Sequence, residues 1–166
     1  MEIQTSISLL NFTSWLVGGQ ADFFCQPKNT EDFNAALLWA HQQKQPITIL
    51  GGGSNVLIHD AGVRGLVINN RKFSGIEVIE DPYKLKMTCL AGTGKSEVLK
   101  QFLKYKLAPA LFLAGLPGDV GGGVVMNAGV SENFTPKEFG EIVEWIEVVD
   151  ITDQGHLQTR QMYAEE

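Results

Sequence analysis

The sequence predicts a small fold in which α-helices and β-strands share a hydrophobic core. Its 166 residues suit one domain, or two small lobes that share a core. Short apolar segments alternate with two amphipathic helical patterns, an order typical of mixed α and β proteins. Glycine is over-represented, with 18 glycines among the 166 residues against an average use of about 7%. They are concentrated in a few loops, so they indicate special backbone positions and not a linker.

Two helices are expected from apolar residues at helical spacing. The first covers residues 30–43, where Thr30 is a candidate N-cap and Glu31 and Asp32 suit the positive end of the helix dipole. The second covers residues 96–106. The apolar positions are Phe33, Ala36, Leu37 and Ala40 in the first helix, and Val98, Leu99, Phe102 and Leu103 in the second.

Strands are expected around these helices. Residues 47–50 form a short apolar run typical of a buried strand, and residues 11–24 suggest a strand interrupted by two glycines. Residues 73–80 and 84–90 suggest a pair of strands joined across Asp81 and Pro82. Further strands are expected over 65–68 and 142–149, with a turn at 153–155.

A glycine-rich loop, residues 51–55 (Gly-Gly-Gly-Ser-Asn), directly follows the strand expected at 47–50. Glycine loses the most backbone freedom on folding, so three in a row indicate positive φ angles or a close approach to the backbone. Bare N–H groups beside a hydroxyl and an amide form an anion-binding concavity, for which a phosphate or diphosphate is the natural ligand. A tight turn between two strands is the alternative interpretation.

A second glycine-rich stretch covers residues 111–129, LFLAGLPGDVGGGVVMNAG. It is mostly apolar but has no regular period, and its glycines interrupt any ordinary helical pattern. We therefore interpret it as backbone that wraps around a ligand.

The net charge of −6 and a pI near 5.1 argue against nucleic acid as a partner, because a phosphate backbone requires a basic face. One local cluster of basic residues lies on or beside the second helix, and its lysines are expected to form a solvated surface. These are Lys95, Lys100, Lys104 and Lys106.

No metal site is predicted, because His41, His59 and His156 have no ligand spacing. Cys25 and Cys89 lack disulfide or metal spacing as well, which fits a reducing compartment. The first twelve residues lack the features of a signal peptide, and no apolar run approaches the roughly 18 residues of a membrane helix. The chain is expected to be soluble, cytoplasmic and without a membrane partner.

Residues 90–96, LAGTGKS, resemble the end of a nucleotide-triphosphatase P-loop between a strand and a helix. The motif requires a glycine five residues before Gly94, where Cys89 stands. The dinucleotide fingerprint fails too, because Glu97 replaces its last glycine. A triphosphatase would depend on Lys95. With two glycine-rich loops and no convincing acid–base set, the sequence favours a protein that binds a cofactor, whose chemistry the cofactor supplies.

Four stretches in order resemble the UDP-N-acetylenolpyruvoylglucosamine reductase (MurB) family of bacterial peptidoglycan synthesis. The similarity covers nearly the whole chain. These stretches are Thr13-Ser14 with Val17 to Asp22; Leu50 to Leu57 followed by Asp60 and Gly65; Ala91 to Gly94; and Leu113 to Gly122 continuing into Met126 to Gly129.

The resemblance implies an α+β, two-lobed FAD-binding fold of the vanillyl-alcohol-oxidase (PCMH) type, with lobes over residues 1–70 and 71–166. The first loop would bind the FAD diphosphate, and the second stretch would line the flavin and its diphosphate. The FAD should be non-covalent, because the first loop carries no histidine. The implied cofactor-binding residues are Leu50, Gly51, Gly52, Gly53, Ser54, Asn55, Val56, Pro117, Gly118, Val120, Gly121, Gly122, Asn127, Ala128 and Gly129.

The reaction implied by the resemblance passes hydride from NADPH through FAD to the enolpyruvyl group of a UDP-sugar, giving UDP-N-acetylmuramate. The family's catalytic serine and its Tyr-Arg-x-Ser motif match no position here, so no catalytic residue is assigned. The chain is interpreted as the FAD-binding part of a longer enzyme, inactive alone and monomeric. Two alternatives stay open: another flavin oxidoreductase of the same fold, and a non-catalytic nucleotide-binding module.

Overall fold

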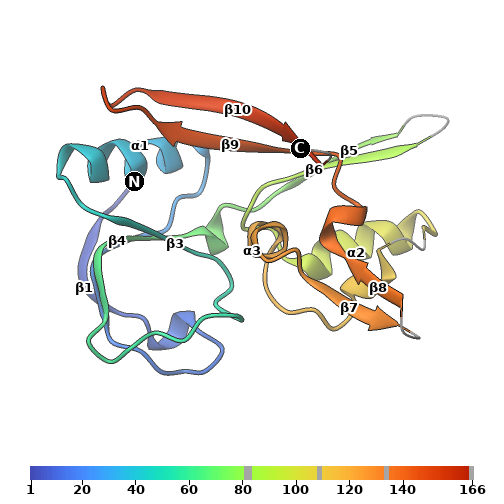
Figure 1. Ribbon diagram of the computed structural model, residues 1–166, viewed down its shortest axis with the longest axis horizontal. Coiled ribbons are helices and arrows are strands. Elements are labelled where there is room, and N and C mark those ends of the chain that lie inside the picture. Colours follow the sequence, from blue (N-terminus) through green and yellow to red (C-terminus); the bar gives the residue numbers. More distant parts are fainter. Residues whose placement is uncertain (81–83, 108–109, 133–134, 165–166) are drawn as a thin grey trace.

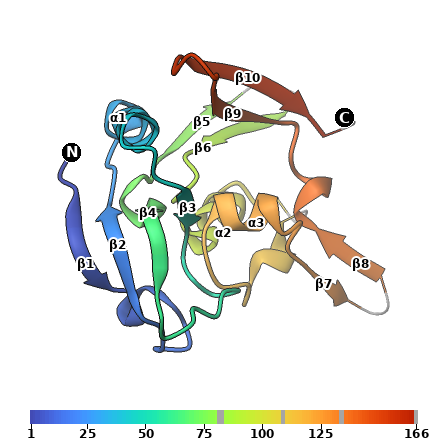
Figure 2. The same ribbon diagram turned by 60° about the vertical axis from the view of Figure 1, so that its left-hand side comes forward.

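A computed structural model describes residues 1–80, 84–107, 110–132 and 135–164 of the chain. Two groups of elements lie side by side, and a long hairpin crosses above them (Figure 1). The first group is built on a four-stranded sheet in the order β1-β2-β4-β3. The second holds two hairpins and two helices (Figure 2). Its side chains form a separate core.

In the first lobe, β1 (Gln4–Ser8) is antiparallel to β2 (Gln20–Cys25), whereas β2, β4 (Val63–Asn69) and β3 (Ile47–Leu50) are mutually parallel. Helix α1 (Thr30–Gln42) covers one face of this sheet. Alternate strand residues therefore supply two cores. The core under α1 contains Cys25, Ala36, Leu37, Ala40, Leu66 and Ile68, and the core on the other face contains Leu9, Ala21, Phe24, Leu50 and Val67.

The first helix is confirmed at its expected position, with one correction at its start. The N-cap is Asn29 and not Thr30, because the Asn29 side chain accepts a hydrogen bond of 2.8 Å from the backbone N–H of Asp32. An asparagine in extended conformation can satisfy a free N–H of the first turn, and Thr30 is already helical.

Two strand predictions in this lobe need correction. Strand β3 exists, but Ile47, Thr48 and Ile49 are exposed because β3 lies at the edge of the sheet. The strand expected from residue 11 begins only at Gln20, after the 3₁₀ turn Leu10–Phe12 and an irregular segment. In that segment a Cβ at Gly19 would collide with the backbone of Asp60, so the glycine permits two loops to touch.

The second lobe begins after the 3₁₀ turn Asn70–Lys72. Strands β5 (Ile76–Glu80) and β6 (Leu85–Cys89) pair antiparallel as expected, although the predicted connection at Asp81 and Pro82 lies outside the described residues. Helix α2 (Lys95–Lys104) confirms the second expected helix. The core around it contains Val98, Ala110, Phe112, Leu113 and Phe139.

Residues 111–129 are more regular than predicted. They contain the 3₁₀ turn Leu111–Leu113 and a six-residue helix, α3 (Val120–Val125), in which three glycines stand in the first turns. Strands β7 (Gly129–Glu132) and β8 (Thr135–Glu138) follow as an antiparallel pair, and the 3₁₀ turn Phe139–Glu141 closes the lobe.

The last two strands, β9 (Trp145–Ile151) and β10 (Leu157–Tyr163), form an antiparallel hairpin that lies over α1 (Figure 1). Val149, Ile151 and Leu157 pack against the core under α1. The hairpin falls within residues 71–166 of the sequence, yet these three side chains pack against the core of the first lobe.

Candidate functional site

The first loop, residues 51–55, presents its backbone in one orientation because protein donors hold its carbonyl groups. The Asn69 amide nitrogen donates to the carbonyl oxygens of Leu50 (3.0 Å) and Gly51 (3.1 Å). The Arg71 guanidinium donates to the Gly52 carbonyl (2.7 Å), and the Ser14 N–H to that of Gly53 (3.0 Å). The carbonyl groups at 50–53 thus all face the protein.

The N–H groups of the same loop have no such partners. Within the described ranges, the backbone N–H groups of residues 52–55 donate to no protein acceptor. Gly53 has a φ of +70°, and a Cβ there would collide with the carbonyl oxygen of Phe12. Successive unpaired N–H groups in such a turn form an anion-binding concavity. The loop thus offers the backbone donors that the phosphate-loop interpretation requires.

The second loop, residues 117–122, divides into two parts. The N–H groups of Gly118 and Asp119 donate to no acceptor in the described part of the chain. Those of Val120 and Gly121 donate to the carbonyl oxygens of Thr93 (2.8 Å) and Ala91 (2.7 Å), and that of Gly122 donates to the Asp119 carboxylate (2.8 Å). Only the start of the second loop therefore has backbone N–H groups free to bind a ligand.

The two loops meet, and we call their contact the seam. A Cβ at Gly52 would lie 2.9 Å from the Cα of Gly118, and one at Gly51 would collide with the Asp119 carboxylate. At these positions the glycines permit the two backbones to approach. The seam thus brings together two regions of the sequence that both carry unpaired N–H groups.

Two charged residues are buried at the seam. Asp119 is 4% exposed; its Oδ1 accepts the bond from Gly122, whereas Oδ2 has no partner among the described residues. Lys95 is 5% exposed, and its Nζ donates to the Pro117 carbonyl oxygen (3.0 Å). Burial lowers the pKa of Lys95, and Asp119 opposes that shift. The expectation that Lys95 lies on a solvated surface was wrong.

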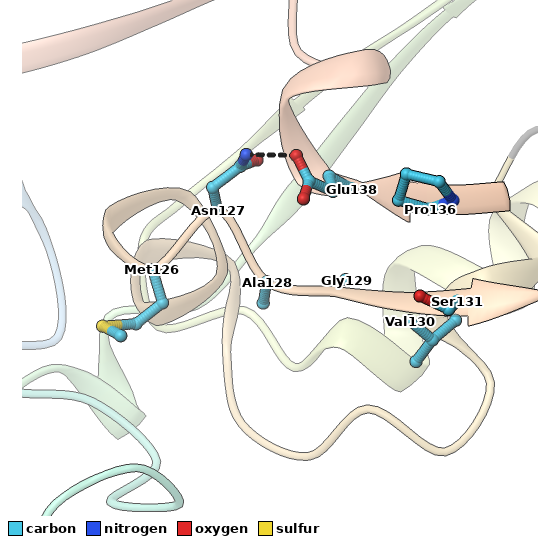
Figure 3. A pocket seen from close by; sticks show the side chains of 8 residues that line it. All are labelled: Met126, Asn127, Ala128, Gly129, Val130, Ser131, Pro136 and Glu138. Carbon is cyan, nitrogen blue, oxygen red and sulfur yellow. Dashed lines mark hydrogen bonds between the residues drawn. The ribbon is translucent and has the colours of Figure 1, made fainter. Parts of the chain in front are cut away.

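Residues 127–129 lie at the other end of α3, away from the seam. They line a hollow of about 320 Å³ beside the β7–β8 hairpin (Figure 3). The Asn127 side chain donates to Glu138 (2.7 Å) and accepts from the N–H of Gly140 (2.9 Å), so it orients the hairpin. The residues around the hollow are Met126, Asn127, Ala128, Gly129, Val130, Ser131, Pro136 and Glu138.

The remaining predicted positions have mixed placements. The side chain of Leu50 is buried in the first lobe, and Val56 is partly exposed after the first loop. Pro117 contributes its carbonyl oxygen to Lys95. Asn69 and Asp119 were missed as site residues, although an asparagine pair at the end of an apolar strand was a usable signal for Asn69.

Other kinds of site receive no support from the described residues. No group of three or more histidine, cysteine or acidic side chains is placed to hold a metal ion in them. Cys25 and Cys89 are both free thiols. Among the helices described, none combines the length and apolar character needed to cross a bilayer.

These residues fit a dinucleotide whose diphosphate lies at the seam. The unpaired N–H groups of both loops suit phosphate oxygens. The glycines let the two loops come close enough for one ligand to meet both. The six residues of α3 span about 9 Å, which separates the seam from the hollow at residues 127–129. An extended ligand could therefore contact both.

Comparisons with known proteins identify the family of the chain. The profile of a family described as FAD binding domain matches residues 21–159. The chain is 38% identical to the UDP-N-acetylenolpyruvoylglucosamine reductase of Prochlorococcus marinus MIT 9313 over 152 residues, which are 92% of this chain and 48% of that protein. It is 34% identical to the Synechococcus sp. RCC307 protein of the same name, covering 100% of this chain and 52% of the other. The chain thus spans about half the length of these relatives.

Among solved structures, a cholesterol oxidase variant from Brevibacterium sterolicum superimposes with a TM-score of 0.72 at 14% identity, covering 98% of this chain and 33% of the other. This likeness concerns the fold alone. Together with the family match it confirms the α+β FAD-binding fold of the vanillyl-alcohol-oxidase type. The chain belongs to the FAD binding domain family, and its sequence resembles the FAD-binding region of the UDP-N-acetylenolpyruvoylglucosamine reductases.

Proposed function

We propose that this chain binds FAD non-covalently, with the diphosphate at the seam and the flavin toward the hollow beyond α3. The observation that carries this proposal is the seam itself, where unpaired N–H groups from residues 52–55 and from Gly118 and Asp119 come together. The backbone conformation of the first loop is fixed before any ligand binds, because Asn69, Arg71 and Ser14 donate hydrogen bonds to its carbonyl groups. Such preorganisation lowers the cost of binding.

The longer protein would be an NADPH-dependent oxidoreductase that converts UDP-N-acetylenolpyruvoylglucosamine to UDP-N-acetylmuramate in the cytoplasm. The name and identity of the relatives support this substrate. FAD would supply the electron transfer between NADPH and the substrate, and the residues of this chain would bind and orient it. Contacts with the UDP-sugar would lie mainly in the half of the longer protein that corresponds to the part of the relatives outside their match to this chain. The chain alone would be inactive and monomeric.

Binding is tested by titrating the purified chain with FAD and following flavin fluorescence. We expect a saturable 1:1 complex from which unfolding releases all the flavin, as a non-covalent cofactor requires. A chain that stays colourless and leaves flavin fluorescence unchanged would overturn the proposal. Flavin that stays attached after unfolding would contradict non-covalent binding.

The reaction is tested with a protein that extends this chain to the length of its relatives. We expect NADPH oxidation that requires the enolpyruvyl UDP-sugar, and none from the 166-residue chain. Oxidation that ignores this substrate but responds to another sugar or hydroxy acid would favour a different flavin oxidoreductase. FAD binding without any NADPH oxidation would favour a non-catalytic module.

A further inference from the structure

A buried ammonium group, that of Lys95, lies beside the second loop. Lys95 begins α2, and the Pro117 carbonyl oxygen is the one hydrogen-bond acceptor of its Nζ among the described residues. The ammonium also lies 5.8 Å from the centre of the Phe139 ring. An ammonium has three donors, so burial with one acceptor leaves capacity for an anion.

The Lys95 ammonium and the Ser54 hydroxyl lie near the same point beside Gly118. The position that a Cβ would take at Gly118 lies 2.9 Å from Ser54 Oγ and 3.8 Å from Lys95 Nζ. Gly118 itself has a φ of +96°, a conformation that favours glycine. A hydroxyl from the first lobe and an ammonium from the second thus flank the start of the second loop.

Asp119 supplies the opposite charge at the same place. Its Oδ2 is buried without a partner and lies against Gly51 of the first loop. A buried carboxylate oxygen without a hydrogen bond is unfavourable, and a second anion nearby would raise that cost. Lys95 offsets the charge of Asp119 through space, which agrees with the way Asp119 opposes the pKa shift of Lys95.

We propose that Lys95 is a ligand of the dinucleotide diphosphate, and that the opposing charge of Asp119 limits the affinity. This inference rests on the proposed binding of FAD and adds a side-chain charge to the backbone N–H groups of the seam. The ammonium would donate to a phosphate oxygen beside Gly118. The carboxylate, held by its bond from Gly122, would repel the same phosphate at longer range.

Removal of the two charges should change FAD affinity in opposite directions. Lys95→Met should weaken FAD binding about 10-fold to 100-fold, the effect of one charge-assisted hydrogen bond. It should also reduce the salt dependence of the affinity, because one phosphate contact is lost. Asp119→Asn should tighten FAD binding at least threefold, since an asparagine oxygen can still accept from Gly122 while the charge is gone.

The controls separate this role from a structural one. Lys100→Met removes an exposed lysine on the same helix and should leave FAD affinity unchanged, and Lys95→Arg should retain most of it. Thermal unfolding establishes that each variant is folded. If Lys95→Met does not fold, the proposal is tested with Asp119→Asn alone. Unchanged or weaker FAD binding by Asp119→Asn would overturn the proposal.

Two further outcomes are distinguishable. A Lys95→Met variant that is folded and binds FAD like the unchanged chain, with the same salt dependence, would overturn the role of Lys95 and leave the proposed function intact. An unchanged chain that does not bind FAD would overturn both.

Discussion

The Asp119 carboxylate lies directly against the Cα of Gly51, although 67 residues separate the two in the sequence. A side chain at Gly51 would collide with both carboxylate oxygens. The lobes can therefore close on each other only because the first loop has no Cβ at this point. The shape of the seam depends on this pair of residues as much as on any ligand.

Gly51→Ala should destabilise the chain by about 1–3 kcal/mol, because the added methyl group must displace a buried carboxylate. The measurement is urea unfolding followed by circular dichroism. Asp119→Ser, a shorter side chain that can still cap α3, should recover part of the loss. Gly75→Ala is the control, since its Cβ would meet only an ordinary contact at 3.5 Å and should change stability little. Equal effects of the two alanines would contradict the packing argument.

Asn69→Asp should cost about 2–4 kcal/mol, because the variant loses both N–H donors and turns a negative charge toward two carbonyl oxygens. The loop should lose its single orientation, so FAD affinity should fall as well. Urea unfolding and FAD titration measure the two effects. Asn11→Asp provides the matched exposed control and should alter stability by less than about 0.5 kcal/mol. An unaltered FAD affinity in Asn69→Asp would show that the loop does not need this anchor.

The Cys25 thiol should make stability decrease at alkaline pH. Burial, assisted by the charge of Asp32, raises the pKa of Cys25 from 9.0 to about 11. Between these values the folded chain holds a proton that the unfolded chain has lost. The contribution is therefore complete below pH 9 and is lost as the pH rises through about 11. Unfolding free energies of the unchanged chain and Cys25→Ala should converge over that range; parallel curves would refute the assignment.

Leu157→Ala should destabilise the chain by about 1–2 kcal/mol, because Leu157 packs from β10 against the core under α1. Leu57→Ala is the matched control at a side chain that is 75% exposed, and it should have little effect. Urea unfolding compares the two. If both variants matched the unchanged chain, the β9–β10 hairpin would not contribute to the first lobe.

Local patterns were enough for several parts of the fold. Helices α1 and α2 follow from apolar residues that repeat every turn, and the β5–β6 pair follows from two apolar runs around a turn. The Gly-Gly-Gly-Ser-Asn loop could be recognised as a candidate anion site because three consecutive glycines are costly without a close approach. These features depend on residues that are neighbours in the sequence, so they can be predicted from the sequence alone.

Tertiary contacts decided the rest. Whether β3 is buried depends on what lies beside it in the sheet, and its edge position leaves Ile49 exposed. Lys95 belongs to a run of surface-like lysines in the sequence, but the second loop and Phe139 cover it.

The sequence by itself determined that two glycine-rich loops exist and that one of them suits a phosphate. It could not determine that they meet, that Asn69 orients the first, or that the carbonyl oxygens of Thr93 and Ala91 accept from the N–H groups of Val120 and Gly121. Only the folded chain decides these points, because each depends on groups brought together from distant parts of the sequence.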